Sequence, residues 1–248
     1  YRGTVYRREV DHNDHLAVAY HFARFADAGL GVLEAVGLGD GHMERAARGC
    51  GTNDCYVRYQ REQRLRHVEI SSRRAVAFYA EQRHAAEARR VPWDGPPREL
   101  RPHPRGLEPF RDTARDTVKP WEMDVFGQSA LASYIHRFSA ANSHTLAGFG
   151  MTPSYMRAER RGFSTFEFQL ALTGALRPGD LIRVRSAPVH VGTSSVRLLH
   201  VMTNEKTGER VATLEQFGVH LDLDARRPAP LPDALRDKAR AMLAASDG

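Results

Sequence analysis

The chain contains few cysteines and few lysines, and it has no long apolar run. The two cysteines, Cys50 and Cys55, cannot form a disulfide framework, and no second pair exists to complete a zinc site. We therefore expect two reduced thiols and no metal ion. No apolar stretch is long enough to cross a membrane. Together these absences predict a soluble, cytoplasmic protein without membrane insertion.

The excess of positive charge also lacks the form that a nucleic-acid interface needs. The formal net charge is +6, and it comes from arginine, because the only lysines are Lys119, Lys206 and Lys238. The arginines are scattered, with no run longer than a pair, which is typical of a solvated surface. We expect no nucleic-acid partner. A weaker interpretation is that the charge attracts an anionic substrate carrier, such as a phosphorylated coenzyme or an acidic carrier protein.

An internal repeat is the main feature that the sequence does contain. Asp124 lies 113 residues after Asp11, and at this offset eight of the 27 positions from 11 to 37 carry identical residues. This number is several times what random pairing would produce. The other identical pairs are Ala17/Ala130, Ala19/Ala132, Arg24/Arg137, Phe25/Phe138, Ala28/Ala141, Leu33/Leu146 and Gly37/Gly150. The chain therefore consists of two copies of one unit.

Both copies show the same order of predicted elements. A short extended segment precedes a long helix, which in copy one runs from about residue 14 to 37 with apolar residues on most faces. Gly37 and Gly150 are suited to end the two helices. Strands then follow by their alternation. In copy two they cover 163–172, 181–192, 194–204 and 210–224, and in copy one, more weakly, 55–65, 67–74 and 75–84.

One helix that is apolar on most faces, followed by antiparallel strands, predicts an α+β unit in which the sheet wraps around a buried helix. Two such units in tandem can join their sheets edge to edge. We expect an N-terminal unit over 1–88 and a C-terminal unit over 116–227. The Pro- and Arg-rich residues 89–115 are predicted to be a linker or long loop, and 228–248 a turn with a short helix.

Three polar residues stand at alternate positions just before the first predicted helix. The stretch "DHNDHLAVAY" begins at Asp11 and contains Asn13 and His15. In an extended segment, alternate side chains point the same way, so these three can face one pocket at the start of the helix. An N-cap would need only one of them. The structural alternative is that Asp11 is a turn residue and that Asn13 is the cap.

The order of elements resembles the hotdog fold, and the duplication resembles the double-hotdog thioesterases. Hotdog acyl-CoA thioesterases commonly carry D-x-x-G-H-[VML]-N before the central helix. Asp11, His15 and Leu16 match this pattern, whereas Asp14 replaces its Gly and Ala17 its Asn. The fold implied by the resemblance is two tandem hotdog units, each with an antiparallel sheet wrapped around a long central helix.

A second motif is similar to the plastid-type acyl-ACP thioesterases. Their D-x-N-x-H pattern is met by Asp11, Asn13 and His15. Those enzymes also carry Y-R-R-E-C on the following strand, where this chain has "YQREQ". Glu62 therefore falls on the catalytic Glu of that family, and Gln63 replaces its Cys.

The resemblance implies a thioesterase that hydrolyses an acyl thioester to a free acid and a thiol, with acyl-CoA favoured over acyl-ACP as the carrier. Glu62 and His15 would share the activation of water, Asn13 would position the water or the carbonyl, and Asp11 would be nucleophile or base. The free N–H groups at the helix start would hold the thioester oxygen. We expect these four side chains to converge there, without a cofactor.

The other assigned positions are weaker. Tyr20, Tyr59 and Gln63 are predicted to contact the substrate. In copy two Asp124 survives, but Gln128 replaces the imidazole, and the matching strand has no Glu. We therefore expect copy two to be a structural or substrate-shaping half, with Asp124 as a candidate for a vestigial second site.

Two rival functions stay open at this point. One is a hotdog dehydratase or hydratase acting on an acyl thioester, although Asn13 and Glu62 exceed what its single acid–base pair requires. The other is a non-catalytic acyl-binding protein, which the departures at Asp14, Ala17 and Gln63 favour. A monomer is compatible with the internal pairing of two units, and a homo-oligomer built on the outer sheet faces also stays open.

Overall fold

The computed structural model describes residues 2–11, 15–38, 52, 54–59, 67–69, 101, 103–104, 106–124 and 127–244. The chain divides into two compact units. The first comprises Tyr1–Gly51, Gln63–Glu99 and Ala130–Ala132, and the second Thr52–Glu62, Leu100–Ser129 and Ser133–Gly248. Within the described ranges, no helix is long and apolar enough to span a membrane.

A seven-stranded antiparallel sheet forms the second unit. Its strands are β2 (Asp54–Arg58), β4 (Arg111–Thr117), β5 (Arg161–Leu172), β6 (Leu181–Val191), β7 (Ser195–Asn204), β8 (Arg210–Asp222) and β9 (Arg227–Pro228). The order is β2-β5-β8-β7-β6-β4, and β9 pairs with β8. The four strands predicted in copy two are confirmed. Residues 111–115 were predicted to lie in the linker, but they belong to β4, which is the edge strand beside β6.

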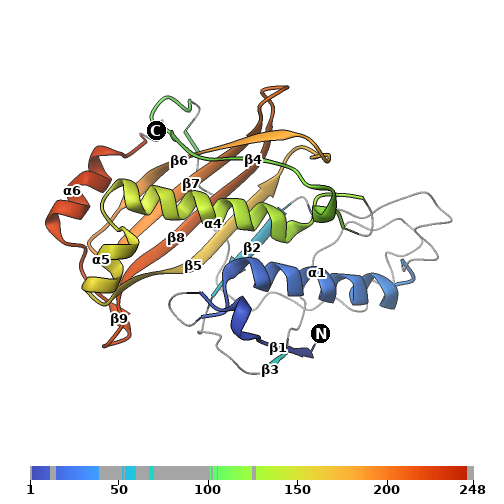
Figure 1. Cartoon of the computed structure of the whole chain (residues 1–248), viewed down its shortest axis with the longest axis horizontal. Coiled ribbons are helices and arrows are strands. Elements are labelled where there is room, and N and C mark those ends of the chain that lie inside the picture. Colours follow the sequence, from blue (N-terminus) through green and yellow to red (C-terminus); the bar gives the residue numbers. More distant parts are fainter. Residues whose placement is uncertain are drawn as a thin grey trace. The chain divides into compact units, whose positions relative to one another are not determined.

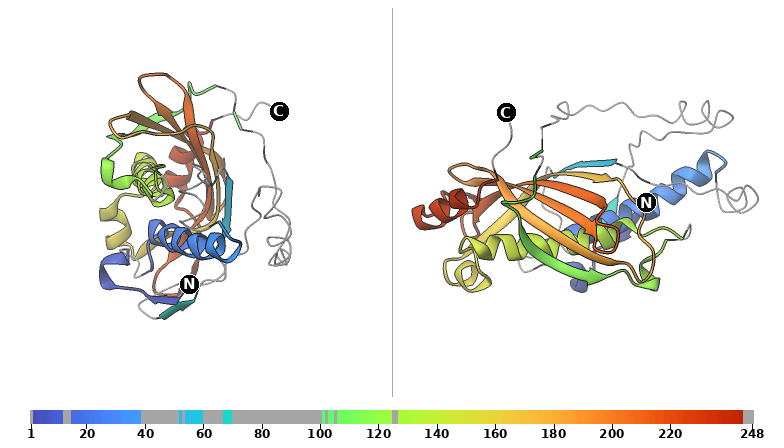
Figure 2. Two further views of the ribbon diagram at one scale, coloured as in Figure 1. Left: turned by 90° about the vertical axis from the view of Figure 1, so that its right-hand side faces the viewer. Right: turned by 90° about the horizontal axis from the view of Figure 1, so that it is seen from above.

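Helix α4 (Leu131–Gly148) lies across one face of this sheet, as Figure 1 and the edge-on views of Figure 2 show. Alternation along the strands supplies the apolar face beneath it: Phe138 of the helix contacts His200 of β7, and Leu198 and Leu214 are fully buried. The expectation of a helix buried on most faces is not met, because His136 and other outward positions are exposed. The sheet covers one side of α4 only.

Two further helices close the left end of the sheet in Figure 1. They are α5 (Pro153–Ala158) and α6 (Asp233–Ala241), and the second confirms the predicted C-terminal helix. Leu231 and Ala239 pack with Phe149 and Met151, which follow α4, and with Leu198 of the sheet. The end of α4 is thereby fixed by apolar contacts on three sides.

The outer face of the sheet carries a separate cluster. Phe110 packs on Ala187, Leu199 and Val201. Beside it, the buried carboxylate of Glu215 is surrounded by cations. Their distances to Glu215 are 2.7 Å for Arg197, 3.0 Å for His103 and 3.4 Å for Arg101. The residues just before β4 therefore lie on the outer face and cover part of it.

The first unit contains fewer described elements. They are β1 (Arg2–Thr4), the 3₁₀ helix η1 (Arg7–Glu9), helix α1 (Val18–Ala35) and β3 (His67–Glu69), which pairs antiparallel with β1. Helix α1 starts later than the predicted residue 14. The strand predicted over 75–84 lies outside the described residues.

The repeat seen in the sequence recurs in local geometry. Shifting α1 by 113 residues reproduces the bounds of α4, and shifting η1 reproduces the 3₁₀ helix η3 (Pro120–Glu122). An isolated bridge joins Val10 to Leu16 in copy one and Met123 to Ser129 in copy two. These positions also differ by 113. The two copies therefore share one backbone course from the 3₁₀ helix to the end of the long helix.

The two helices also end alike. Gly37 and Gly150 have positive φ angles of 80° and 107°, as a residue just past a helix requires. The next N–H reaches back to a leucine carbonyl, from Leu38 to Leu33 over 2.9 Å and from Met151 to Leu146 over 3.0 Å. Both predicted stops are confirmed.

Strand β2 comes from copy one, yet it pairs with β5 of copy two inside the second unit. Tyr56 lies opposite Gln169, which is its own counterpart at the offset of 113. The flanking pairs are Asp54 with Ala171, Cys55 with Leu170, Val57 with Phe168 and Arg58 with Glu167. Exchanging the two copies leaves this register unchanged.

Candidate functional site

Asp11 and His15 are brought together by a closed turn. The Asp11 N–H donates to the His15 carbonyl over 2.8 Å, and the His15 N–H donates to Asp11 Oδ1 over 3.1 Å. Both residues are half-buried. One oxygen of the carboxylate is thus held by the backbone of the residue that carries the imidazole. The structural reading of Asp11 as a turn residue is confirmed, and this turn is what brings the two side chains near each other.

The premise of an extended segment is wrong here. Val10 and Leu16 form an antiparallel bridge, so the chain between them reverses direction. Alternate residues in a reversing loop do not share a face, and the alignment argued from alternation fails for this segment. Asp11 and His15 still meet, because the turn hydrogen bonds join them directly.

The turn leads into a helix start without a side-chain cap. The N-cap of α1 is Ala17, whose methyl group cannot accept a hydrogen bond, and its first turn holds no acidic residue. Unsatisfied N–H groups and the positive end of the helix dipole therefore face the entry turn uncompensated by a carboxylate of that helix turn. Such a site favours an oxygen that carries negative charge.

A buried ion pair anchors this turn from behind. Arg24 of α1 donates to Glu9 Oε2 over 2.6 Å and to the Tyr20 carbonyl over 3.2 Å. The Tyr6 N–H also donates to Glu9, over 2.9 Å. Burial alone would raise the pKa of Glu9, but the Tyr6 N–H and the Arg24 guanidinium outweigh it, so the pKa lies below its ordinary value.

Copy two builds the same turn from different side chains. The Asp124 N–H donates to the Gln128 carbonyl over 2.7 Å, and the Gln128 N–H donates to Asp124 Oδ1 over 2.9 Å. The backbone of the turn is thus retained, while an amide stands where copy one has an imidazole. The turn is a property of the fold, and its chemistry is decided by the residue at the position of His15.

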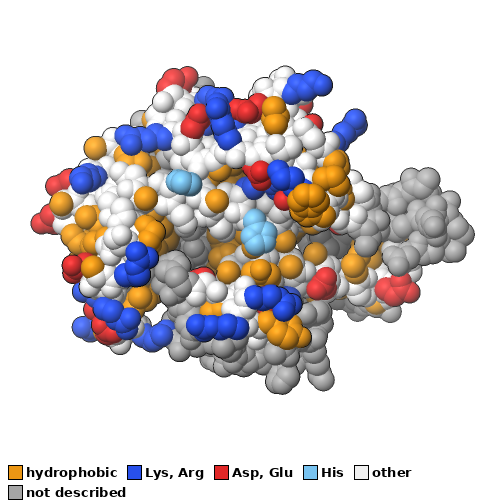
Figure 3. All heavy atoms as spheres, in the orientation of Figure 1, with side chains coloured by type: hydrophobic (Ala, Val, Ile, Leu, Met, Phe, Trp, Pro, Cys, Tyr) orange, Lys and Arg blue, Asp and Glu red, His pale blue; other side chains and the backbone are white. Residues whose placement is uncertain are grey.

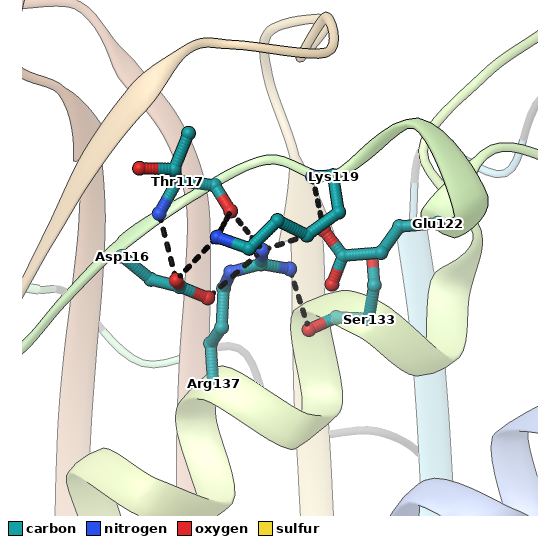
Figure 4. A network of polar contacts seen from close by, with 6 residues as sticks. All are labelled: Asp116, Thr117, Lys119, Glu122, Ser133 and Arg137. Carbon is teal, nitrogen blue, oxygen red and sulfur yellow. Dashed lines mark hydrogen bonds and ion pairs between the residues drawn. The ribbon is translucent and has the colours of Figure 1, made fainter.

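The ion pair is also repeated, as Figure 4 shows. Arg137 donates to Glu122 over 2.7 Å and to the Ser133 carbonyl over 3.2 Å, the counterparts of the contacts in copy one. Copy two adds Asp116, whose carboxylate lies 3.0 Å from Arg137 and 3.0 Å from Lys119. Gly3 is the counterpart of Asp116, so copy one has no carboxylate at that place.

The remaining predicted site residues separate into three groups. Tyr20 packs against a small apolar cluster with Val5 and Leu16 beside the entry turn. Tyr59 belongs to the second unit, where its ring meets Phe168 edge-on at 6.1 Å. Burial raises the pKa of Tyr59 well above its ordinary value, so the phenol stays protonated. Asn13, Glu62 and Gln63 lie outside the described residues.

A row of buried polar side chains beneath α4 was missed by the sequence analysis. Ser186 Oγ lies 2.6 Å from His200 Nδ1 and 2.7 Å from Thr113 Oγ1, and Gln216 donates to Thr165 over 2.7 Å. Burial lowers the pKa of His200 to about 3, so the ring is neutral. Each of these residues alternates correctly along its strand, and only the pairing of the strands reveals that they form a row.

Residues 118–239 match a family model described as the thioesterase-like superfamily. The C-terminal half of the chain is a thioesterase-like hotdog domain. Its sheet order and the helix across the sheet are those expected from the resemblance. One clear hotdog unit is present in the part of the chain that the structure describes, and the matched residues carry its strands and its central helix.

Solved structures agree with this domain. A protein from Staphylococcus aureus, solved in complex with CoA, is similar with a TM-score of 0.50 and 17% identity over 54% of this chain and 84% of that one. A probable thioesterase from Escherichia coli gives 0.46 and 22% over 53% and 98%. A thioesterase from Thermus thermophilus, complexed with coenzyme A and Zn, gives 0.47 and 26% over 54% and 96%. No curated protein matches the chain.

The surface charge of the molecule follows the sequence expectation. On the face drawn in Figure 3, Lys and Arg side chains are scattered among acidic and apolar ones. Several are engaged with carboxylates, as Arg183 is with Glu205 at 2.7 Å and Arg161 with Asp222. The hotdog domain therefore displays its arginines singly or in ion pairs on this face.

Proposed function

We propose that the protein is a thioesterase that hydrolyses an acyl thioester to a free acid and a thiol, with acyl-CoA as the favoured substrate over acyl-ACP. The observation that carries the proposal is the closed turn that holds Asp11 and His15 directly before the uncapped start of α1. A carboxylate, an imidazole and unsatisfied N–H groups are the parts that thioester hydrolysis needs. The thioesterase-like match of the C-terminal half supports the same reaction class.

In the proposed reaction, water attacks the thioester carbonyl carbon and gives its proton to the imidazole of His15 or to a carboxylate. The first N–H groups of α1 hold the oxygen on which negative charge develops. The C–S bond then breaks, and the thiolate takes up the proton and leaves. Asp11 is nucleophile or base in this scheme, and Asn13 and Glu62 keep the roles of positioning and activating the water. Tyr20, Tyr59 and Gln63 are assigned to substrate binding.

The double-hotdog build is part of this proposal. It is supported by the repeated turn, ion pair, helix and helix end of the two copies. The pairing of β2 with β5 gives further support, because Tyr56 and Gln169 are counterparts and the register is unchanged when the copies are exchanged. Two identical subunits related by a two-fold axis would show the same register. The proposed location is the cytoplasm.

The carrier is proposed from chemistry and likeness together. The Staphylococcus aureus protein, which shares the fold, was solved in complex with CoA, and this is compatible with an acyl-CoA substrate here. The predominance of arginine over lysine favours planar, bidentate contacts to carrier phosphates. Asp124 is assigned no activity of its own, since its partner in the turn is Gln128.

The test is release of free thiol from a panel of acyl-CoAs by the full chain and by two matched variants. Asp11→Asn keeps an oxygen that can accept the His15 N–H, so the turn survives while the charge is lost. Asp124→Asn makes the same change in copy two. We expect Asp11→Asn to lose about 100-fold or more in kcat/KM, the size of a general acid–base contribution, and Asp124→Asn to retain the parent rate.

Other outcomes distinguish the rivals. A 2-enoyl or 3-hydroxyacyl thioester product without free thiol favours the dehydratase or hydratase. Binding of acyl-CoA without turnover favours the acyl-binding protein. Equal losses in the two variants would contradict the assignment of the site to copy one.

A further inference from the structure

We propose that Arg24 and Glu9 are positioning residues, which act on the proposed reaction by holding the Asp11–His15 turn at the start of α1. This inference rests on the proposed function. Neither side chain is assigned a contact with the substrate. Their effect passes through the backbone segments that lie on both sides of the turn.

The contacts of Glu9 join these segments. Its carboxylate accepts from Arg24 and from the Tyr6 N–H, and its carbonyl accepts the Ala17 N–H over 2.8 Å. The chain therefore leaves Glu9, reverses through the turn and returns at Ala17 to a hydrogen bond with Glu9 itself. Arg24 fixes the carboxylate to the first turn of α1 through the Tyr20 carbonyl.

Burial makes this link stiff. The side chain of Arg24 is 5% exposed and that of Glu9 is 10% exposed. Water has little access to compete for these groups, and a charge-assisted hydrogen bond is strong in such surroundings. A shift of the carboxylate would leave a buried guanidinium poorly paired. The turn consequently has one favoured position relative to the helix start.

Copy two supplies the matched control. Arg137 and Glu122 repeat the contacts of Arg24 and Glu9 with distances that agree within about 0.1 Å. The turn they hold carries Gln128 and no imidazole. A purely structural ion pair would have the same consequence in both copies. A positioning role predicts that only the pair in copy one affects the reaction.

The experiment compares Arg24→Lys with Arg137→Lys in the full chain. Lysine keeps the charge but cannot bridge the carboxylate and the helix carbonyl with a planar fork. We expect Arg24→Lys to lower kcat by about 10- to 100-fold, as a small misplacement of reacting groups does, with KM changed less than about threefold. Arg137→Lys should lower the melting temperature and leave kcat within about twofold of the parent.

Glu9→Gln and Glu122→Gln form a second, milder pair, because the amide keeps one acceptor oxygen. They preserve the comparison if a lysine variant fails to fold. Equal falls of kcat in the two copies, or falls that follow the unfolded fraction alone, would overturn the inference. So would an unchanged kcat in a folded Arg24→Lys or Glu9→Gln protein.

Amide hydrogen exchange gives a readout that needs no activity. The N–H groups of Asp11 and His15 should exchange faster in Arg24→Lys, while those of Asp124 and Gln128 stay protected. If the parent releases no thiol from any acyl-CoA, the proposed function fails, and this exchange measurement still decides whether the ion pair holds the turn. Unchanged exchange at both amides would end the inference with the function intact.

Discussion

The entries to the two long helices share a skeleton and differ in chemistry. Each has a 3₁₀ helix, a buried Arg–Glu pair, an Asp-closed turn and a bridge at the same relative positions. Copy one places an imidazole in its turn, whereas copy two has Gln128 there and adds Asp116 to its ion pair. Retained geometry with exchanged side chains shows that the turn serves the fold, and that function depends on what the turn displays.

The comparison also explains why copy two is the better supported half. Its ion pair gains a second carboxylate and a lysine, and its sheet is described from β4 to β9. Asp116 and Glu122 both have pKa values below the ordinary range; burial opposes this, and hydrogen bonds to Lys119 and Arg137 outweigh it. Copy two has thus invested its entry in ion pairing.

The largest effect is expected from exchanging the residue that distinguishes the turns. His15→Gln installs the residue that copy two already accommodates, so the turn should form while the imidazole is lost. We expect kcat/KM for acyl-CoA hydrolysis to fall by about 100- to 10,000-fold. Gln128→His should leave the parent rate within about twofold. Restoration of activity in the double variant would show that copy two can carry the reaction.

The next effect concerns His21 and its counterpart Tyr134. Burial lowers the pKa of His21 to about 4, helped by the charge of Arg24. Between about pH 6.5 and 4 the unfolded chain binds a proton that the folded chain excludes. The free energy of unfolding therefore falls as pH falls through this window, by up to about 3 kcal/mol.

His21→Tyr should remove this dependence, because a buried tyrosine stays neutral there, as Tyr134 does. Urea unfolding at pH 7.5 and 4.5 measures the difference. An unchanged pH slope in the variant would show that His21 is protonated in the fold. The dependence due to the buried His200 should remain in both proteins.

A smaller effect separates the two helix ends. Gly37→Ala places a methyl group on a residue with φ of 80° and nothing within 4 Å, so strain alone should cost about 1 kcal/mol. At Gly150 the methyl would also meet Leu235 at 3.3 Å, which should bring the cost to about 2 kcal/mol. Denaturant midpoints rank the variants, and the reverse order would mean that Leu235 yields without strain.

The smallest effect should be stabilising. Gly31 is exposed within α1 and has nothing within 4 Å, whereas its counterpart in α4 is His144, which is also exposed. Gly31→Ala should raise the free energy of unfolding by about 0.5–1 kcal/mol, and His144→Ala by no more than about 0.5 kcal/mol. Thermal unfolding checks both. A loss of stability in Gly31→Ala would indicate that the glycine has a neighbour in the folded chain.

Much of the fold could be predicted because its signals are local. The strands of copy two alternate between apolar and polar residues, and turn residues such as Gly179, with φ of 92°, separate them. The helix ends at Gly37 and Gly150 need only a residue that tolerates positive φ. By contrast, β4 begins inside a Pro- and Arg-rich stretch, where "RDTARD" reads as a polar loop and becomes a strand only because β6 offers it an edge.

The candidate site was predicted in its residues and not in its geometry. Asp11 and His15 were named from their spacing, but the expected extended segment is a reversing turn. Glu9 and Arg24 were not singled out, because a Glu and an Arg 15 residues apart read as solvated surface. The signal that could have found them is the repeat itself, since Glu9 and Glu122 are also identical at the offset of 113.

The sequence by itself determined the duplication, the two long helices with their glycine ends, and the strands of the C-terminal half, because each depends on residues within a few positions of one another. Only the tertiary structure decided that a strand of copy one joins the sheet of copy two and that an arginine and a glutamate become a buried pair. Those outcomes depend on which distant segments meet and exclude water, and no local pattern encodes that meeting.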